Sequence, residues 1–278
     1  KIRPPVTFQG GKQRLAPAIV DAMQIDPSEP FADLCCGSGA ITIEVVSRGT
    51  PASAVTMVDT SLWGDLWTEV GAGQFDLDTL RKRVDDFPTD LDLHAEHLQA
   101  LHSEPIGADR SVVFLLLQAA SFGGALILRP TEDRWQRWSP IKRWACTIPG
   151  QRNSRNSMMP HPSVIYQRMT VVCDLLLGVR AQVRDFTTTR HDSGCVYIDP
   201  PYFGTSGYGA RTPVYDFVDF ASHSKDARVW VSESRALGHH AVCMANGRKQ
   251  GGMHGRRARL TEEWLTRTQL HSGEYHAR

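Results

Sequence analysis

Short apolar runs rich in β-branched residues recur along the chain, and several of them end at a turn or at an acidic residue. The run Phe31-Ala-Asp-Leu-Cys-Cys precedes Gly37, the run 54–58 precedes Asp59, and the run 195–198 precedes Asp199. Runs of this length bounded by turn residues predict buried strands. Strands are predicted at residues 31–36, 54–58, 182–186, 195–198, 228–232 and 262–266.

Helical periodicity separates the predicted strands. Leu15, Ile19 and Met23 recur four residues apart, and Pro17 lies early enough to be tolerated in the first turn of a helix. Further helices are predicted at residues 40–48, 111–120 and 164–177. Strands that alternate with helices favour an α/β fold built on an open, Rossmann-like sheet.

The composition is that of a globular protein with room for a sizeable core, since 41% of the 278 residues are hydrophobic and 22% are charged. This length predicts one large domain or one domain with an insertion. A net charge of +1 argues against a uniformly basic nucleic-acid-binding protein. Neither a secretory signal nor an apolar run of membrane-spanning length occurs, so we expect a cytoplasmic protein that does not bind a membrane.

The six cysteines include no Cys-x-x-Cys pair. Cys35 and Cys36 are adjacent, and Cys195 lies in a strand-like apolar run. We therefore expect buried free thiols rather than disulfides or a zinc site, and no metal.

Charge is segregated along the chain. Residues 61–104 hold ten acidic and three basic residues, an excess of seven negative charges that predicts a solvated helical face. Trp63 and Trp67 in this segment share one helix face, where core packing is favoured over contact with a bound nucleoside.

The charge reverses further along the chain. Residues 129–155 hold seven basic and two acidic residues, an excess of five, with tryptophans interleaved. Arginines mixed with aromatic residues predict a loop or hairpin that contacts phosphates and stacks on bases, with a solvated basic loop as the alternative. Residues 248–259 add five basic residues and no acidic one, which makes a second candidate patch for phosphate contacts.

A nucleoside site is predicted around the first strand. Gly37-Ser38-Gly39 separates this strand from a helix, and Asp59 ends the next strand 22 positions after Gly37, where it can accept hydrogen bonds from ribose hydroxyls. Thr42 replaces the third glycine of the dinucleotide-binding motif, which disfavours a cofactor with a pyrophosphate. S-adenosylmethionine, a nucleoside without phosphates, fits better, and a tight turn without a ligand is the alternative.

A candidate catalytic motif follows the strand at 195–198. Asp199-Pro200-Pro201-Tyr202 places a carboxylate, a rigid turn and an aromatic ring at the carboxyl end of a strand, the sheet edge at which ligands bind in open α/β folds. An ordinary strand stopped by two prolines is the alternative. Phe8-Gln-Gly-Gly-Lys12 adds a glycine loop with a positive charge before the first helix.

These motifs, taken in order, resemble those of the Dam-type DNA adenine-N6 methyltransferases (the D12 class, alpha group), over nearly the whole chain. Phe8–Lys12 resembles the Tyr/Phe-x-Gly-Gly-Lys opening of that family, and 30–40 resembles its Pro-Phe-x-Gly-Ser-Gly-Ala region. Gln118–Gly124 resembles its Asn-Arg-x-x-Phe-Asn-Gly segment, Asp185-Phe186 its Asp-Phe pair, and 196–202 its catalytic motif.

The resemblance implies a site-specific enzyme that transfers a methyl group from S-adenosylmethionine to the N6 amine of an adenine flipped out of double-stranded DNA, leaving S-adenosylhomocysteine. Asp199 and the carbonyl of Pro200 would accept hydrogen bonds from the amine, with Pro201 fixing the turn and Tyr202 stacking on the base. The cofactor-binding residues it implies are Phe8, Gly10, Gly11, Lys12, Asp33, Cys35, Gly37, Ser38, Gly39, Asp59, Asp185 and Phe186.

The resemblance also implies a division of the chain. Residues 1–60 and 171–278 would form the catalytic domain, and 61–170 a helical and hairpin target-recognition insert. The DNA-binding residues it implies are Phe122, Arg129, Arg134, Trp135, Arg137, Lys142, Arg143, Arg256 and Arg257. We expect a monomer or a weak dimer, in a bacterial or phage-infected cell, with a cognate restriction endonuclease as a candidate partner.

Two departures concern the recognised DNA sequence. Residues 118–124 lack the Asn-Arg and the second Asn of the family, and Ser232-Glu233-Ser234 replaces an Asn-containing segment.

Two alternative functions remain. One is a ribosomal RNA methyltransferase that acts on guanine N2 or adenine N6, since the Asp33–Ala40 segment also resembles that of the ribosomal RNA guanine-N2 methyltransferases. The other is a non-catalytic DNA-binding protein on the same fold.

Overall fold

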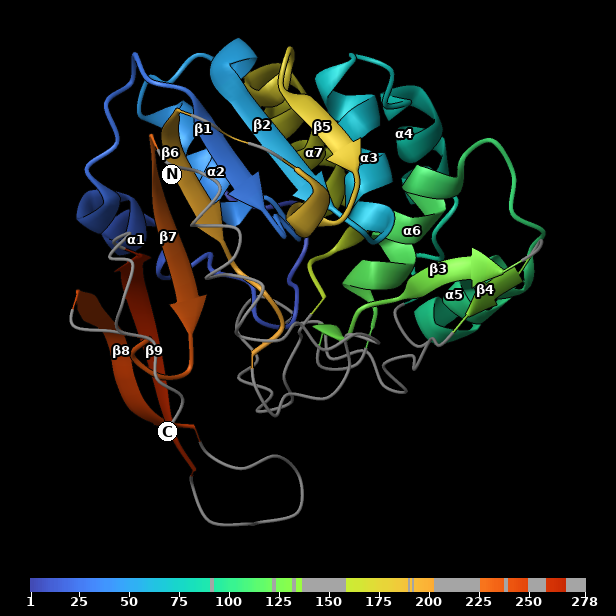
Figure 1. Ribbon diagram of the computed structural model, residues 1–278. Coiled ribbons are helices and arrows are strands. Elements are labelled where there is room, and N and C mark those ends of the chain that lie inside the picture. The colour runs from blue at the N-terminus through green and yellow to red at the C-terminus, as the bar shows by residue number, and fades with distance from the viewer. Residues whose placement is uncertain are drawn as a thin grey trace.

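The computed structural model describes residues 1–90, 93–121, 124–131, 134–136, 159–189, 191, 193–202, 226–237, 240–249 and 259–268. Its centre is a seven-stranded mixed sheet flanked by helices, which confirms the predicted α/β class and is compatible with a Rossmann-like fold (Figure 1). The strands are β1 (Phe31–Leu34), β2 (Val55–Asp59), β5 (Arg180–Val183), β6 (Gly194–Ile198), β7 (Ala227–Glu233), β8 (Ala241–Lys249) and β9 (Arg259–Thr268).

The strand order is β5-β2-β1-β6-β7-β9-β8. The pairs from β5 to β7 are parallel, and β9 pairs antiparallel with both β7 and β8. The first strand, β1, lies inside the sheet: it pairs with β2 on one side and with β6 on the other. This order creates a topological switch point between β1 and β6, where open α/β sheets bind their ligands.

Both faces of the central strands are buried. Successive residues of a strand point to opposite faces, and Phe31, Met57 and Tyr197 lie with the helices in the larger core cluster. Leu34 and Ile198 lie in a second cluster on the other face. Burial on both sides explains why these strands are nearly continuous apolar runs in the sequence.

The helices are α1 (Ala16–Met23), α2 (Ala40–Ser47), α3 (Leu62–Gly71), α4 (Leu77–Asp85), α5 (His94–Ser103), α6 (Arg110–Ala119) and α7 (Pro162–Leu176). Two short 3₁₀ helices, η1 (Ala52–Ala54) and η4 (Phe186–Thr188), flank the sheet. A separate two-stranded hairpin, β3 (Leu128–Thr131) with β4 (Arg134–Gln136), follows α6. Pro17 lies in the first turn of α1, as predicted.

Helix α3 packs directly on the sheet. A Cβ atom on Gly64 would lie 2.5 Å from the Asp59 carbonyl oxygen, and one on Gly71 would lie 2.1 Å from that of Val179. Only glycine allows this approach. The insert was predicted to begin at residue 61, but the helix that follows this position, α3, packs against the central sheet. Trp63 and Trp67 of this helix are buried in the core, stacked with ring centroids 6.0 Å apart, as favoured from their spacing.

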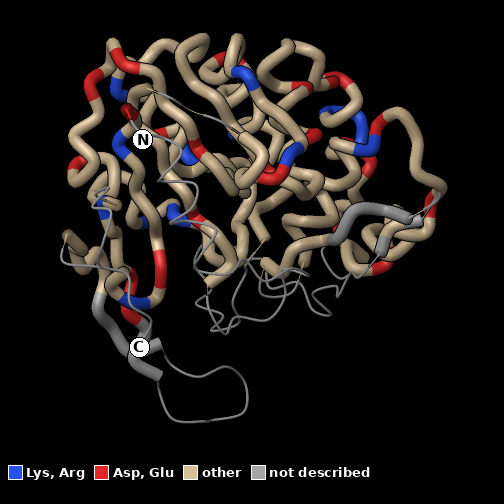
Figure 2. The backbone as a smooth tube through the Cα atoms, viewed as in Figure 1, with Lys and Arg blue, Asp and Glu red and all other residues tan. Residues whose placement is uncertain are grey.

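Most acidic residues of the predicted solvated face, including Asp76, Asp85 and Glu96, are exposed. Figure 2 shows acidic and basic positions interspersed over this helical region. Arg83 of α4 pairs with Glu104 and Asp109.

The structure corrects two strand predictions. Strand β5 covers 180–183, so it begins earlier than predicted and ends before Asp185. No strand was predicted at 241–249, but these residues form β8, so Arg248 and Lys249 of the predicted basic patch lie in a strand that pairs with β9. The cysteines that the structure describes are free thiols. Among the described residues, no helix is both long enough and apolar enough to cross a membrane.

Candidate active site

The carboxyl ends of four neighbouring parallel strands meet at one edge of the sheet. The turn at Gly37 follows β1, Asp59 ends β2, Asp185 follows β5, and Asp199 follows β6. A cavity of about 290 Å³ lies at this edge, beside the switch point between β1 and β6. The structure therefore brings the predicted cofactor turn and the predicted catalytic motif into one pocket, which is also lined by the Phe8–Lys12 loop.

Aromatic side chains hold the glycine turn after β1. Gly37 and Gly39 have φ angles of 49° and 73°, in the left-handed region that favours glycine. The Trp67 indole Nε1 donates a hydrogen bond of 2.7 Å to the Gly37 carbonyl. A Cβ atom on Gly39 would lie 2.9 Å from the Trp67 ring, and one on Gly37 would lie 3.0 Å from the Phe8 ring. The turn thus requires glycine both for its backbone angles and for its contacts.

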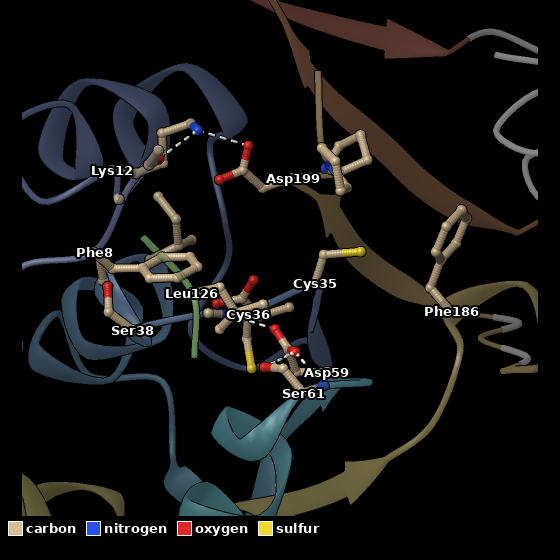
Figure 3. A pocket seen from close by; sticks show the side chains of 18 of the residues that line it. Phe8, Lys12, Cys35, Cys36, Ser38, Asp59, Ser61, Leu126, Phe186 and Asp199 are labelled. Atoms are coloured by element: carbon tan, nitrogen blue, oxygen red, sulfur yellow. Dashed lines mark hydrogen bonds and ion pairs between the residues drawn. The ribbon is translucent and has the colours of Figure 1, made fainter. Parts of the chain in front are cut away.

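Asp59 has both carboxylate oxygens engaged by the protein. Oδ2 accepts the Gly37 backbone N–H at 2.9 Å. Oδ1 accepts the Ser61 backbone N–H at 2.8 Å and the Ser61 hydroxyl at 2.6 Å. Figure 3 shows Asp59 beside Ser61 at one end of the pocket. Asp59 therefore ties the end of β2 to the turn after β1, and it also lines the cavity.

Asp33 is held by the residue that replaces the third glycine of the dinucleotide motif. Its Oδ2 accepts the Thr42 hydroxyl at 2.7 Å and the Thr42 backbone N–H at 3.2 Å. Burial raises the pKa of the Asp33 carboxyl to about 7, against these hydrogen bonds, which lower it. Thr42 thus fixes the buried Asp33 carboxyl group in the wall of the pocket. A glycine at this position, as in the dinucleotide-binding motif, has no side chain with which to bind Asp33.

Asp185 and Phe186 lie at the far wall of the pocket, after β5. The Asp185 carboxylate is the N-cap of η4, accepting the Thr187 backbone N–H at 2.9 Å and the Thr187 hydroxyl at 2.7 Å. Phe186 is buried against the second core cluster. Figure 3 shows Phe186 on the side of the pocket opposite Phe8. The two aromatic rings thus stand at opposite walls of one cavity.

A buried charge cluster occupies the end of the pocket beside the Asp199-Pro200-Pro201-Tyr202 motif. Lys12 is only 5% exposed, and its Nζ lies 2.6 Å from Asp199 Oδ1 and 3.3 Å from Glu263 Oε1. Nζ also donates to the Gly10 carbonyl at 2.9 Å and lies 4.8 Å from the centroid of the Tyr202 ring. The Tyr202 hydroxyl donates to Glu263. Figure 3 shows the Lys12 and Asp199 side chains pointing toward each other.

Asp199 is the titratable centre of this cluster. Burial raises the pKa of its carboxyl to about 6, the Lys12 ammonium opposes this rise, and the Glu263 carboxylate adds to it. A carboxyl group in this range changes its protonation state near neutral pH, which suits a residue that exchanges hydrogen bonds with an amine.

The N-terminal glycine loop is fixed to the segment that follows α6. The Gln9 backbone N–H donates to the Gly124 carbonyl at 2.9 Å. The buried Gln118 amide donates to the carbonyls of Gly124 and Ala125 and accepts the Ile127 N–H. Gln118 thus anchors this segment, from which Leu126 lines the cavity.

Sequence reasoning missed several residues of the pocket. Glu263 is the most important, because it lies on an antiparallel strand that no nucleoside-binding motif includes. The others are Gln9, Cys36, Ala40, Ile41, Thr60, Ser61, Leu126, Arg184 and Tyr197. Most of these residues lie close in sequence to the predicted motifs, which could have identified them. Glu263 lies far from every predicted motif in the sequence.

Few of the predicted DNA-binding residues have described side chains. Trp135 was predicted to contact DNA. In the structure it lies in the hydrophobic core at 6% exposed, so its ring is not on a surface where it could stack on bases. Arg129 lies in β3 and Arg134 in β4. Phe122, Arg137, Lys142, Arg143, Arg256 and Arg257 lie outside the described residues.

Neither models of known protein families nor curated protein sequences give a significant match to this chain. Within the described part of the chain, no three metal-ligating side chains gather in one place.

Proposed function

We propose that this protein is an S-adenosylmethionine-dependent methyltransferase that methylates the N6 amine of an adenine in double-stranded DNA. The observation that carries the proposal is the single pocket formed by the Gly37 turn, Asp59 and the Asp199-Pro-Pro-Tyr202 motif. Such a pocket can hold a nucleoside cofactor at one end and an acceptor amine at the other, which is the arrangement that direct group transfer requires.

The charge of the pocket supports a cationic cofactor. Two basic side chains, Lys12 and Arg184, line the cavity. The carboxylates that line it are Asp33, Asp59, Asp185, Asp199 and Glu263. The acidic groups outnumber the basic ones even though Asp33, with a pKa of about 7, is partly protonated near neutral pH, and this balance favours a sulfonium and repels phosphate groups. S-adenosylmethionine fits this balance better than a dinucleotide does.

When bound, S-adenosylmethionine supplies the methyl group and leaves as S-adenosylhomocysteine. Asp199 accepts a hydrogen bond from the acceptor amine, and the carbonyl of Pro200 accepts a second, which favours the nitrogen geometry that attacks. The prolines fix the direction of that carbonyl because their φ angles are restricted. Tyr202 holds the base by stacking, and a base inside a duplex must be flipped out to reach it.

The decisive test is transfer of methyl groups from labelled S-adenosylmethionine to unmethylated double-stranded DNA, with RNA as the competing substrate. We expect N6-methyladenine in DNA at one sequence context, identified by single-molecule sequencing of a methylation-free host that expresses the chain. Label that appears only in RNA would establish the ribosomal RNA alternative, and binding without label in either would establish the non-catalytic one.

The rate of methyl transfer should fall as the pH drops below about 6. The pKa of Asp199 is about 6, so at lower pH the carboxyl group is protonated and cannot accept the amine hydrogen bond as a carboxylate. Single-turnover rates at saturating cofactor, measured from about pH 5 to about pH 8, check this expectation. Saturation is needed because Asp33, with a pKa of about 7, also lines the cofactor end of the pocket. A rate that stays constant down to pH 5 would contradict the role of Asp199.

Alanine at Arg129 or Arg134 should weaken DNA binding and flatten its salt dependence. Each phosphate contact removed lowers the slope of log K against log salt by about 1. Fluorescence anisotropy with a labelled duplex over a range of salt concentrations measures both effects. Arg81→Ala is the matched control, because Arg81 is an exposed arginine of α4 with a 66% exposed side chain in the acidic region. Equal slopes for the control and the hairpin variants would count against a DNA-binding hairpin.

A further inference from the structure

Glu263 reaches the catalytic end of the pocket from the antiparallel part of the sheet. It lies on β9, where it pairs with Ala245 of β8, and the next residue, Trp264, pairs with the last residue of β7. Its carboxylate contacts Lys12 and accepts the Tyr202 hydroxyl. Glu263 therefore contacts two residues of the predicted site at once.

The charges of the cluster do not cancel in pairs. One buried ammonium, Lys12, lies between two carboxylates, those of Asp199 and Glu263. Asp199 has the shorter contact with it, 2.6 Å against 3.3 Å. A carboxylate bound to an ammonium at this distance has fewer lone pairs left for an amine donor. A buried ammonium, in turn, cannot be left without a counter-ion except at a large cost in free energy.

We propose that Glu263 is a positioning residue for methyl transfer, acting as the second counter-ion of Lys12 so that Asp199 can exchange this ion pair for a hydrogen bond with the acceptor amine. The inference rests on the function proposed above. Glu263 also holds the Tyr202 ring in place through its hydroxyl, so the surface on which the base stacks and the carboxylate that binds its amine are set by one side chain.

The proton balance of the reaction gives Glu263 a second role as counter-ion of Lys12. The amine nitrogen becomes positively charged as it forms its bond to the methyl carbon, while the electron pair of the breaking carbon–sulfur bond stays on sulfur. The nitrogen then loses a proton, which passes to Asp199 and from there to solvent. While Asp199 is neutral, Lys12 remains paired because Glu263 is still a carboxylate.

Several titratable groups face Asp199, and they must be considered in any pH profile. They are Lys12, Asp33, Cys35, Tyr197, Tyr202 and Glu263. Among the described residues, the carboxylates that interact with Asp199 are those of Asp33 and Glu263, and Glu263 is the one that also contacts Lys12. Its removal should lower the pKa of Asp199 for two reasons that act in the same direction: a negative charge is lost, and Lys12 pairs with Asp199 alone.

The chain offers a matched control on the same strand. Glu262 precedes Glu263, does not line the pocket, and accepts a hydrogen bond of 2.8 Å from the Trp264 indole Nε1. Glu262→Gln therefore makes the same chemical change one position away. Glu263→Asp keeps the charge on a shorter side chain and tests whether charge or shape matters.

Single-turnover kinetics and carboxyl ¹³C NMR of the full chain, with labelled aspartate, test the inference. For Glu263→Gln we expect a fall of about 10-fold or more in the rate constant, a cofactor KM within about 2-fold of the wild type, and an acid limb shifted to lower pH. Glu263→Asp should restore the acid limb in part. If Glu263→Gln folds poorly by thermal melting, Glu263→Asp carries the kinetic comparison.

Two results would overturn the inference: rates and acid limbs for Glu263→Gln that match those of Glu262→Gln, or an Asp199 titration that is unchanged by Glu263→Gln. The NMR titration requires no turnover. If the wild-type chain methylates neither DNA nor RNA, the proposed function fails, and the pairing of Glu263 with Lys12 then stands or falls on the Asp199 titration alone.

Discussion

Asp199→Ala is expected to remove methyl transfer while leaving the binding of S-adenosylmethionine nearly unchanged. The substitution deletes the carboxylate that accepts the amine hydrogen bond, at the end of the pocket away from Asp59. General-base and electrostatic contributions of this kind amount to factors of about 10² to 10⁴ in rate. We therefore expect turnover to fall at least about 1,000-fold. Methyl incorporation into DNA and calorimetric titration with the cofactor measure the two effects separately.

Asp199→Asn is the informative companion variant. Asparagine keeps one oxygen acceptor and nearly the same shape, but it cannot balance the charge of Lys12, which then pairs with Glu263 alone. Its turnover should lie between those of alanine and the wild type. Because Lys12 keeps Glu263 as a partner in both variants, the fold should survive. Near wild-type turnover in Asp199→Ala would rule out the proposed catalytic role.

Trp67→Ala is expected to lower the free energy of unfolding by about 3–5 kcal/mol, the largest loss of stability among the variants proposed for this protein. Trp67 is 1% exposed, stacks on Trp63 and donates to the Gly37 carbonyl. The substitution therefore leaves a large cavity and also releases the glycine turn. Because that turn lines the predicted cofactor pocket, cofactor binding should weaken as well. Urea unfolding and calorimetric titration measure the two losses.

Two further variants separate packing from the hydrogen bond. Trp67→Phe keeps part of the buried aromatic surface and loses the indole donor, whose hydrogen bond is worth about 1 kcal/mol. Trp264→Ala is the matched control, since Trp264 is a partly buried tryptophan on β9, away from the turn. A loss in Trp264→Ala as large as that in Trp67→Ala would show that the effect is general for tryptophan and unrelated to the turn.

Much of the pocket was predictable because parallel strands impose a simple rule. Apolar runs that end in Gly37, Asp59 and Asp199 must be buried strands, and the carboxyl ends of neighbouring parallel strands meet at one edge. The three residues meet because β2, β1 and β6 are neighbours in the sheet, and this strand order was not predicted. Asp185 was included only through the family resemblance, and it lines the same pocket although β5 ends earlier than predicted.

The rest was not predictable because it depends on long-range packing. Thr42 departs from a known motif in the sequence, but nothing there shows that it binds Asp33. Strand β8 has no clear alternation of apolar and polar residues and carries glycine and basic residues, so its pairing with β9 decides its conformation. Trp135 stands among arginines in the sequence, and only the fold shows that its ring is buried.

The charge cluster joins two distant parts of the chain. Lys12 belongs to the first loop, and Glu263 belongs to the last described strand. Contacts between residues so far apart in sequence carry a loop-closure cost in entropy, which slows the folding steps that form them. A chain that has not yet formed β9 has no Glu263 carboxylate beside Lys12, so Asp199 is left as the counter-ion and the Gly10 carbonyl as a neutral acceptor. The charge cluster is thus complete only once β9 has joined the sheet. A partly synthesised chain without β9 is therefore expected to lack methyltransferase activity.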